Sequence, residues 1–218
     1  MPGTRSIFIF SIVASAIFLA VRPLTGADWP VIFKTLSILL LAVAGFRRYA
    51  LLGAALTASA AGDFLLGVSR LGGLGPDTLF LLGLGAFLIA HLLYIALFRA
   101  FLSARIPSPR AARLTGILAI LLLLVALLSR IYGALGGLRG PVILYAAVIS
   151  TMGVCAMLAK IPSPLAAVGA LLFIASDSLI ALGKFSSAIP AGGILIWVTY
   201  YAAQLSLARA FENARTVK

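Results

Sequence analysis

Apolar residues run along this chain in long continuous stretches, separated by short segments that hold most of the charged residues. They do not alternate with polar residues, as they would on the strands of a membrane β-barrel. In the hydrocarbon of a bilayer, only helices and closed barrels satisfy every backbone hydrogen bond, so the continuous runs predict helices of roughly 17–25 residues. We predict eight spans, over residues 6–21, 31–46, 50–68, 78–98, 114–129, 141–159, 165–182 and 190–208.

The composition agrees with this pattern. Of the 218 residues, 63% are hydrophobic and 10% are charged, whereas a soluble domain has about 25% charged residues. We therefore expect one all-α domain over residues 1–218, a bundle of eight transmembrane helices. The first run follows Arg5 and contains a cleavage-like Ala14-Ser15-Ala16, but this site lies inside the apolar run, so we expect a retained span and not a signal peptide. The single Cys155 excludes a disulfide framework.

The net charge of +12 is distributed in a way that indicates membrane topology. A nucleic-acid site would need basic residues clustered with aromatics on a soluble face, so no nucleic-acid partner is expected. Cytoplasmic loops carry an excess of Lys and Arg, and eleven such residues fall on one side of the predicted membrane: Arg5, Arg47, Arg48, Arg99, Arg105, Arg110, Arg113, Lys160, Arg209, Arg215 and Lys218. The opposite side has Arg22, Arg70, Arg130, Arg139 and Lys184, together with Asp28 and Asp77. We expect both termini in the cytoplasm and a location in a bacterial inner (plasma) membrane.

The two halves of the chain share short segments at a nearly constant offset. Three of them recur in order, 30–34 as 141–145, 61–65 as 175–179 and 99–101 as 209–211. Such matches raise the hypothesis of two parallel four-helix repeats, residues 1–105 and 110–218.

Two carboxylates lie within predicted spans at equivalent positions of this repeat, Asp63 and Asp177. A carboxylate at the centre of a bilayer costs roughly 2.5–3.5 kcal/mol, so each one is a functional hypothesis that needs a partner. Both are expected within about five residues of the outer ends of their helices. Lys34 is at the same depth and is a candidate counter-ion for Asp63. Tyr145 replaces the lysine in the second repeat, so Asp177 has no lysine at its depth.

Other polar residues follow helical spacing toward the membrane midplane. His91 and Tyr94 are three residues apart on one face of the fourth predicted span. The eighth predicted span has a polar and aromatic face made of Trp197, Tyr200, Tyr201 and Gln204. Together with the carboxylates, these residues predict a polar pocket that opens toward the outer leaflet.

Each of these residues also has a purely structural interpretation. Asp63 and Lys34 can form a structural ion pair, and Lys34 can extend its ammonium group to the interface. His91 can hydrogen-bond between helices, and tyrosines and tryptophans often pack or anchor a helix at the interface. The residues alone leave these alternatives open.

Several common chemistries have no support in the sequence. One histidine with two aspartates makes a poor zinc site, and neither a Gly-x-Ser-x-Gly elbow nor a phosphate-binding glycine loop is present. No metal and no cofactor are expected. Two buried carboxylates with a lysine, a histidine and tyrosines suit acid–base chemistry or a proton relay.

Taken in order, these motifs resemble the YhhN family of eight-span membrane proteins, which includes the vertebrate lysoplasmalogenases. The shared features are Lys34, a Gly-Asp-x-x-Leu box at 62–66, a Phe-x-x-Gly-Leu-x-x-Phe-x-x-x-His-x-x-Tyr box at 80–94, Ser-Asp with a later Leu and Phe at 176, 177, 179 and 185, and Tyr-Tyr-x-x-Gln at 200–204. One departure is Thr35, where members of the family often have proline.

The resemblance implies cleavage of the vinyl-ether bond of a lysoplasmalogen, which gives a fatty aldehyde and glycerophosphoethanolamine or glycerophosphocholine. The expected partners are this lysophospholipid and membrane lipids. Vinyl-ether hydrolysis needs an acid and an ionised carboxylate, and two carboxylates in different environments can divide these roles. We assign the acid to Asp177 and the ionised carboxylate to Asp63, paired with Lys34, although the reverse assignment stays open.

The remaining site residues have supporting roles in this hypothesis. His91 and Tyr94 would orient water or the departing oxygen, and the other predicted contributors to substrate binding are Tyr145, Trp197, Tyr200, Tyr201 and Gln204. Two alternatives are a transporter with an Asp63–His91 proton relay and a non-catalytic lipid-binding membrane protein. The oligomeric state is left open.

Overall fold

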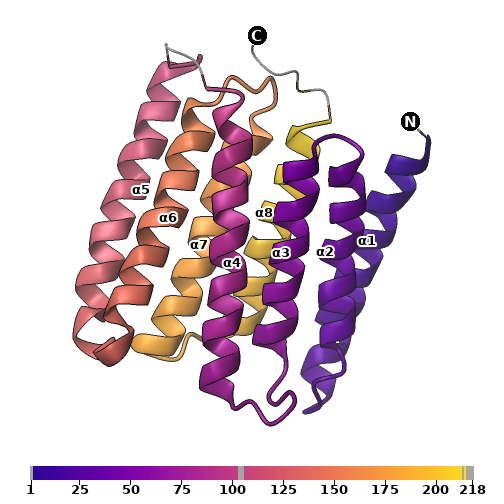
Figure 1. Ribbon diagram of the computed structural model, residues 1–218, viewed down its shortest axis with the longest axis vertical. Helices are drawn as coiled ribbons and strands as arrows, with labels where there is room; N and C mark the ends of the chain where they lie inside the picture. Colours follow the sequence, from indigo (N-terminus) through magenta and orange to yellow (C-terminus); the bar gives the residue numbers. More distant parts are fainter. Residues whose placement is uncertain (1, 103–105, 213, 215–218) are drawn as a thin grey trace. The chain divides into compact units, whose positions relative to one another are not determined.

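The computed structural model describes residues 2–102, 106–212 and 214; Arg105, Arg215 and Lys218, which the charge analysis assigned to the cytoplasmic side, lie outside them. The described chain is all-helical and confirms the eight predicted helices (Figure 1). The helices are α1 (Pro2–Val21), α2 (Val31–Phe46), α3 (Ala50–Gly67), α4 (Pro76–Arg99), α5 (Arg110–Ile131), α6 (Arg139–Leu158), α7 (Leu165–Phe185) and α8 (Gly192–Ala210). Short 3₁₀ turns follow α1 (η1, Arg22–Leu24) and α5 (η2, Tyr132–Ala134, and η3, Gly136–Leu138).

Within the described residues, six helices are long and apolar enough to cross a membrane: α1, α3, α4, α5, α6 and α7. They make this a multi-pass membrane protein. The other two helices differ from the six for physical reasons. The apolar helix α2 has only 16 residues, and α8 is less apolar because it carries Tyr200, Tyr201 and Gln204 on its buried face. Membrane crossing by α2 and α8 stays a prediction.

The chain forms two compact units, residues 1–94 and 95–218. In the first unit, α2 packs against both α1 and α3 (Figure 1). In the second unit, α7 packs against α5, α6 and α8. The single domain and the repeats at 1–105 and 110–218 stay predictions.

Glycines let α2 and α3 approach closely at both ends of their antiparallel pair. A Cβ atom on Gly53 would lie 2.2 Å from the ring of Phe46, and one on Gly67 would lie 2.1 Å from Val31 Cγ2. Neither position has room for a side chain. Small residues at helix interfaces permit such close packing in membranes, and here they set the register in which α2 faces α3.

The contact between α3 and α4 within the first unit also depends on glycines that face large side chains, and this occurs at two positions. A Cβ atom on Gly62 would lie 2.6 Å from the ring of Phe87, and one on Gly83 would lie 2.7 Å from Leu66. Each helix therefore contributes one glycine and receives one large side chain. Four residues of the motifs noted above therefore pack these helices together around Asp63: Gly62, Leu66, Gly83 and Phe87.

Two connections at the end of the α2–α3 pair are joined by Asp28. Its Oδ2 accepts hydrogen bonds from the backbone N–H and the hydroxyl of Ser69, both at 2.6 Å. These hydrogen bonds, with a contribution from the charge of Arg22, hold the pKa of Asp28 below its usual value of 3.8. Asp28 is therefore a stable anion at neutral pH and links the α1–α2 connection to the α3–α4 connection.

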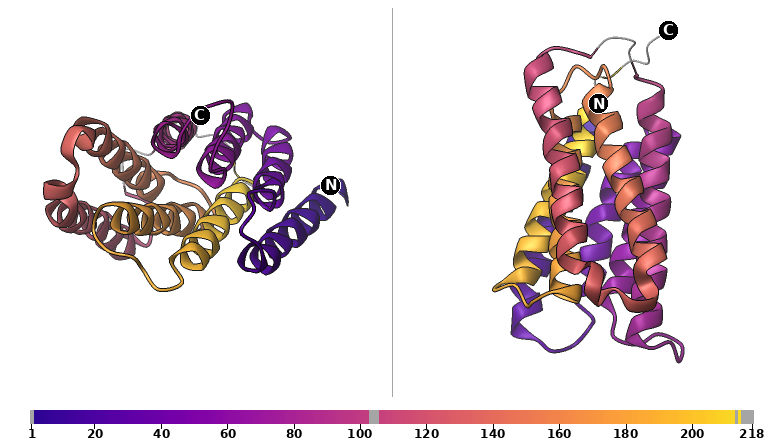
Figure 2. Two further views of the ribbon diagram at one scale, coloured as in Figure 1. Left: turned by 90° about the horizontal axis from the view of Figure 1, so that it is seen from below. Right: turned by 90° about the vertical axis from the view of Figure 1, so that its left-hand side faces the viewer.

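In the second unit, η2 and η3 carry the chain from α5 into α6 (Figure 2). A small apolar cluster lies at this end and consists of Ile131, Leu135 and Val142. Ala181 and Phe185 of α7 pack against it. The cluster therefore ties the ends of α5 and α7 to the start of α6.

Two glycines of α4 provide a matched test of the α3–α4 contact. Gly83→Ala places a methyl group against Leu66, whereas a Cβ atom at Gly85 would meet nothing within 4 Å. We expect Gly83→Ala to lower stability by about 1–3 kcal/mol through overpacking. Gly85→Ala should leave stability unchanged or raise it, because alanine is the better helix former. Melting temperatures in detergent check this, and equal melting temperatures for the two variants would contradict the close packing.

Candidate active site

The first unit forms the ion pair expected from the sequence. Lys34 Nζ lies 3.2 Å from Asp63 Oδ1, with side-chain exposures of 17% and 2%. Lys34 follows Val31 by one helical turn, and Asp63 precedes Gly67 by one turn. The close approach of Val31 and Gly67 therefore brings the two charged side chains together.

Buried hydroxyl groups accompany this ion pair. Ser59 lies one turn before Asp63 on α3 and is fully buried. Neither its hydroxyl nor that of Thr35, the neighbour of Lys34, has a hydrogen-bond partner in the described part of the chain. Sequence reasoning missed Ser59, although its spacing of four from the carboxylate was a usable signal. The segment thus keeps hydrogen-bonding capacity that the ion pair does not use.

His91 and Tyr94 also belong to the first unit and are both fully buried on α4. Their spacing places them on one face of that helix. Their burial agrees with a place inside the protein, away from the lipid. Their roles in catalysis or substrate binding stay predictions.

In the second unit, the hydroxyl of Tyr145 donates a hydrogen bond to Asp177 Oδ2. Tyr145 is buried and Asp177 is half-buried. Each unit therefore joins the aspartate of one helix to a side chain near the start of the preceding helix. The partner is an ammonium group for Asp63 and a phenol for Asp177, so only Asp63 has a full compensating charge in its pair.

The expected depth of Asp177 is wrong. Helix α7 continues to Phe185, three residues beyond the predicted end, because Phe185 packs against the Ile131 cluster and holds the last turn. Asp177 therefore lies eight residues before the helix end, about 12 Å along the axis. Asp63 lies four residues before the end of α3, or about 6 Å. Asp177 is thus farther from its helix end than Asp63.

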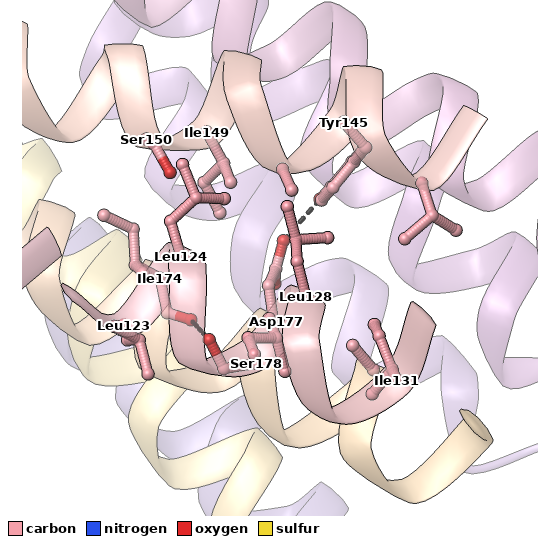
Figure 3. A pocket seen from close by; sticks show the side chains of 14 residues that line it. Leu123, Leu124, Leu128, Ile131, Tyr145, Ile149, Ser150, Ile174, Asp177 and Ser178 are labelled. Carbon is pink, nitrogen blue, oxygen red and sulfur yellow. Dashed lines mark hydrogen bonds between the residues drawn. The ribbon is translucent and has the colours of Figure 1, made fainter. Parts of the chain in front are cut away.

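Asp177 and Tyr145 line a pocket within the second unit (Figure 3). The pocket is a partly open cleft with a cavity volume of about 50 Å³. Its walls come from α5, α6 and α7 and are mostly aliphatic, with Leu124 and Leu128 of α5 opposite Ile149 of α6. An apolar cleft with a few convergent polar groups is the usual form of a small-molecule site.

Two serines contribute the remaining polar groups of the pocket, Ser150 and Ser178. The hydroxyl of Ser178 donates to the carbonyl of Ile174 at 2.7 Å, which keeps it on its own helix. Sequence reasoning missed both. The adjacency of Ser178 to Asp177 was a signal, but nothing in the apolar run around Ser150 singled it out.

The polar face predicted for α8 is buried as a cluster of its own. Gln204 Nε2 donates to the Tyr200 hydroxyl at 3.1 Å, and Trp197 stacks on Tyr201 with ring centroids 5.7 Å apart. Tyr200 also meets Phe173 of α7 edge-on, at 5.3 Å. These α8 residues are not among those that line the pocket of Asp177. The structure brings the four together with one another, and their role in substrate binding stays a prediction.

Metal ligands do not gather in the described part of the chain. No group of three His, Cys, Asp or Glu side chains there could hold a metal ion. The arrangement at Asp177 is therefore a carboxylate, a phenol and aliphatic walls, which can exchange protons with an apolar molecule held beside them.

Comparisons with known proteins show which family the chain belongs to. Proteins named lysoplasmalogenase from Mycobacterium bovis and Mycobacterium tuberculosis are each 36% identical to it over 165 residues, which cover 75% of this chain and 60% of the relative. The match thus spans less than two thirds of the length of these relatives. No solved structure matches the chain. The family model for YhhN matches residues 29–211, which include every candidate site residue above, so the chain belongs to the YhhN family.

Proposed function

We propose that this protein hydrolyses the vinyl-ether bond of a lysoplasmalogen, releasing a fatty aldehyde and glycerophosphoethanolamine or glycerophosphocholine. The observation that carries the proposal is the aliphatic pocket with the Tyr145–Asp177 pair in its wall. The name lysoplasmalogenase of the two mycobacterial relatives supports the same reaction. We also propose that the protein lies in a bacterial inner membrane with both termini in the cytoplasm.

The pocket suits the hydrocarbon tail of such a lipid. Its α5 wall belongs to a helix whose other face is exposed and aliphatic, with Leu122 and Val125 more than half exposed. That face is the kind of surface that contacts lipid tails. A tail in the bilayer therefore has only the α5 wall between it and the pocket. Because both surroundings are apolar, binding of the tail relies on van der Waals packing and not on removal from water.

The chemistry begins with a proton transfer to carbon. We place the transferable proton on Oδ1 of Asp177, because Oδ2 accepts the hydrogen bond from Tyr145. The double-bond electrons take this proton at the carbon farther from the ether oxygen. The other carbon becomes part of an oxocarbenium ion, and Asp177 becomes the carboxylate that offsets its charge.

The second half of the reaction consumes water. Water adds to the cationic carbon and gives its proton to Asp177, which restores the acid and leaves a hemiacetal. The bond between this carbon and the glycerol oxygen then breaks. The hemiacetal hydroxyl loses its proton, the glycerol oxygen gains one, and the aldehyde departs. Tyr145 keeps the carboxyl group oriented through both proton transfers, as a general acid–base site requires.

Asp63 is our proposed second carboxylate. Its ion pair with Lys34 provides a compensating positive charge, and we propose that Asp63 stabilises a cation or activates water. His91 and Tyr94 are proposed to orient water or the departing oxygen, and Trp197, Tyr200, Tyr201 and Gln204 to bind substrate. The alternative is that Asp63 only forms a structural ion pair with Lys34. The two roles predict different activities for a variant that lacks both charges.

Removal of the proposed acid is the first test. We expect Asp177→Asn to lower kcat for aldehyde release from an alkenyl lysophospholipid by about 10²–10⁴-fold. Tyr145→Phe should cause a smaller loss, because it removes only the orienting hydrogen bond. Ser178→Ala is the control from the same pocket and should keep near-normal activity, since its hydroxyl bonds to its own helix. Purified protein in detergent is assayed, which excludes transport as the readout. Full activity of Asp177→Asn would contradict the mechanism.

A double variant separates the two roles of Asp63. Asp63→Asn alone should destabilise the protein by about 3–5 kcal/mol, because it leaves the Lys34 charge without its compensating carboxylate in a largely buried site. Lys34→Met with Asp63→Asn removes both charges and should recover most of the stability. We expect this double variant to fold and to remain inactive. Recovery of activity together with the melting temperature would instead make the ion pair structural and Asp63 dispensable for chemistry.

Filling the pocket tests where the tail binds. Ala146 lines the pocket, whereas its neighbour Ala147 is exposed on the outer face of α6. Ala146→Phe should raise KM for a long-chain alkenyl lysophospholipid by about tenfold or more, since a loss of 1.4 kcal/mol in binding is tenfold. Ala147→Phe should leave KM unchanged. Melting temperatures first show that both variants are folded at the assay temperature. The same KM for both would then rule this pocket out as the tail site.

A further inference from the structure

We infer that Arg130, Arg139 and Lys184 form a phosphate-binding subsite at one end of the pocket in the second unit. This subsite would select a lysophospholipid over a neutral ether lipid with the same tail. The inference rests on the proposed function, because it concerns the other end of the same substrate. It adds a recognition element that the tail pocket and the acid–base residues do not supply.

The three cations lie at three helix ends that meet at the Ile131 cluster. Arg130 directly precedes Ile131, and Arg139 lies one turn before Val142. Lys184 lies one turn after Ala181 on α7. Ile131, Val142 and Ala181 all line the pocket, and Ala181 packs against the cluster that holds the other two. Each cation therefore belongs to the turn that bounds this end of the pocket.

The connecting segments at this end of the second unit are basic in sequence. Segments 129–140 and 182–192 contain these three cations and no Asp or Glu. The corresponding connections of the first unit contain Arg22 and Arg70 together with Asp28 and Asp77. Arg130, Arg139 and Lys184 are all exposed. The predicted topology places both sets on the outer side, where an excess of Lys and Arg is not expected.

Helix dipoles account for only part of this arrangement. Arg130 and Lys184 lie in the last turns of α5 and α7, where a cation is favourable. Arg139 is the first residue of α6, where a cation meets the positive end of the dipole. No acidic residue lies in that first turn. The start of α6 therefore has no acidic side chain in its own first turn, and a bound phosphate would place negative charge there.

The side chains and the distances suit a phosphate group. Arg139 is held over the ring of Tyr132, with its guanidinium carbon 4.9 Å from the ring centroid. Guanidinium groups bind phosphate oxygens in bidentate fashion, and lysine adds a point charge. Lys184 lies seven residues beyond Asp177 on α7, about 10 Å along the axis. In the substrate, roughly six bonds separate the vinyl-ether carbon from phosphorus, about 7 Å when extended, and the flexible side chains can span the difference.

A binding experiment tests the subsite without relying on turnover. The probes are a saturated alkyl-ether lysophosphatidylethanolamine and the alkylglycerol with the same chain, titrated into protein in a neutral detergent. We expect wild-type protein to bind the phospholipid at least about tenfold more tightly. The triple variant Arg130→Gln, Arg139→Gln and Lys184→Gln should lose this preference and keep its affinity for the alkylglycerol, which also shows that its pocket is folded. Equal affinity of wild-type protein for the two probes would overturn the inference.

Matched variants separate a local site from general charge. Arg22→Gln with Arg70→Gln removes two cations from the connections of the first unit and should keep the preference. Arg130→Lys with Arg139→Lys keeps the positive charge and should retain part of the preference for the phospholipid. If the first-unit variant lost as much preference as the triple variant, the effect would be general charge and the inference would be wrong.

Activity measurements distinguish failure of the subsite from failure of the proposed function. With an alkenyl lysophospholipid as substrate, the triple variant should show a raised KM and a nearly unchanged kcat. Hydrolysis by wild-type protein without any phosphate preference would overturn the subsite alone. A phosphate preference that the triple variant loses, in a protein that releases no aldehyde, would overturn the proposed function and leave the subsite standing.

Discussion

A carboxyl group among apolar helices has to be held by a partner, and much of this structure serves that requirement. Each aspartate would cost roughly 2.5–3.5 kcal/mol at the centre of a bilayer. Asp63 meets Lys34, and Asp177 meets Tyr145. In the first unit, the partner can reach the carboxylate because Gly53 and Gly67 remove the side chains that would separate α2 from α3. Close packing of α2 against α3 is therefore a requirement for compensation of the Asp63 charge.

The two pairs differ in a way that suits a division of labour. An ammonium group compensates the charge of Asp63, whereas a phenol only orients Asp177. Both pairs join an aspartate to a side chain of the preceding helix, and the partner differs, an ammonium group from Lys34 against a phenol from Tyr145. The pocket adjoins Asp177, the carboxyl group to which we assign the role of the acid.

The sequence predicted the helices and singled out both aspartates as candidates, because long apolar runs and isolated charges are local signals. It also predicted Lys34 as a partner, since Lys34 and Asp63 are equally far from the outer ends of their helices. It could not predict the pocket, because leucines such as Leu124 and Leu128 look the same in a run whether they fill a space or line one. The sequence-based prediction ended α7 too early, at residue 182, because Gly183 and Lys184 are typical of a loop. The packing of Phe185 against the Ile131 cluster supports the last turn of the helix.

Hydrolysis of a lipid inside a membrane has to bring together a hydrocarbon tail, a charged head group and water. In the proposed binding mode, the tail site, the carboxyl group and the head-group site follow one another along α7. Ile174 lies in the aliphatic part of the pocket, Asp177 lies half-buried one turn later, and Lys184 is exposed near the helix end. A lysophospholipid aligned along this helix would have its tail in the pocket, its vinyl ether beside the carboxyl group of Asp177 and its phosphate at the proposed phosphate-binding subsite. Because α7 continues to Phe185, Lys184 stays on the same helix as Asp177, about 10 Å from it along the axis. In the proposed binding mode, one helix therefore carries the groups for both ends of the substrate.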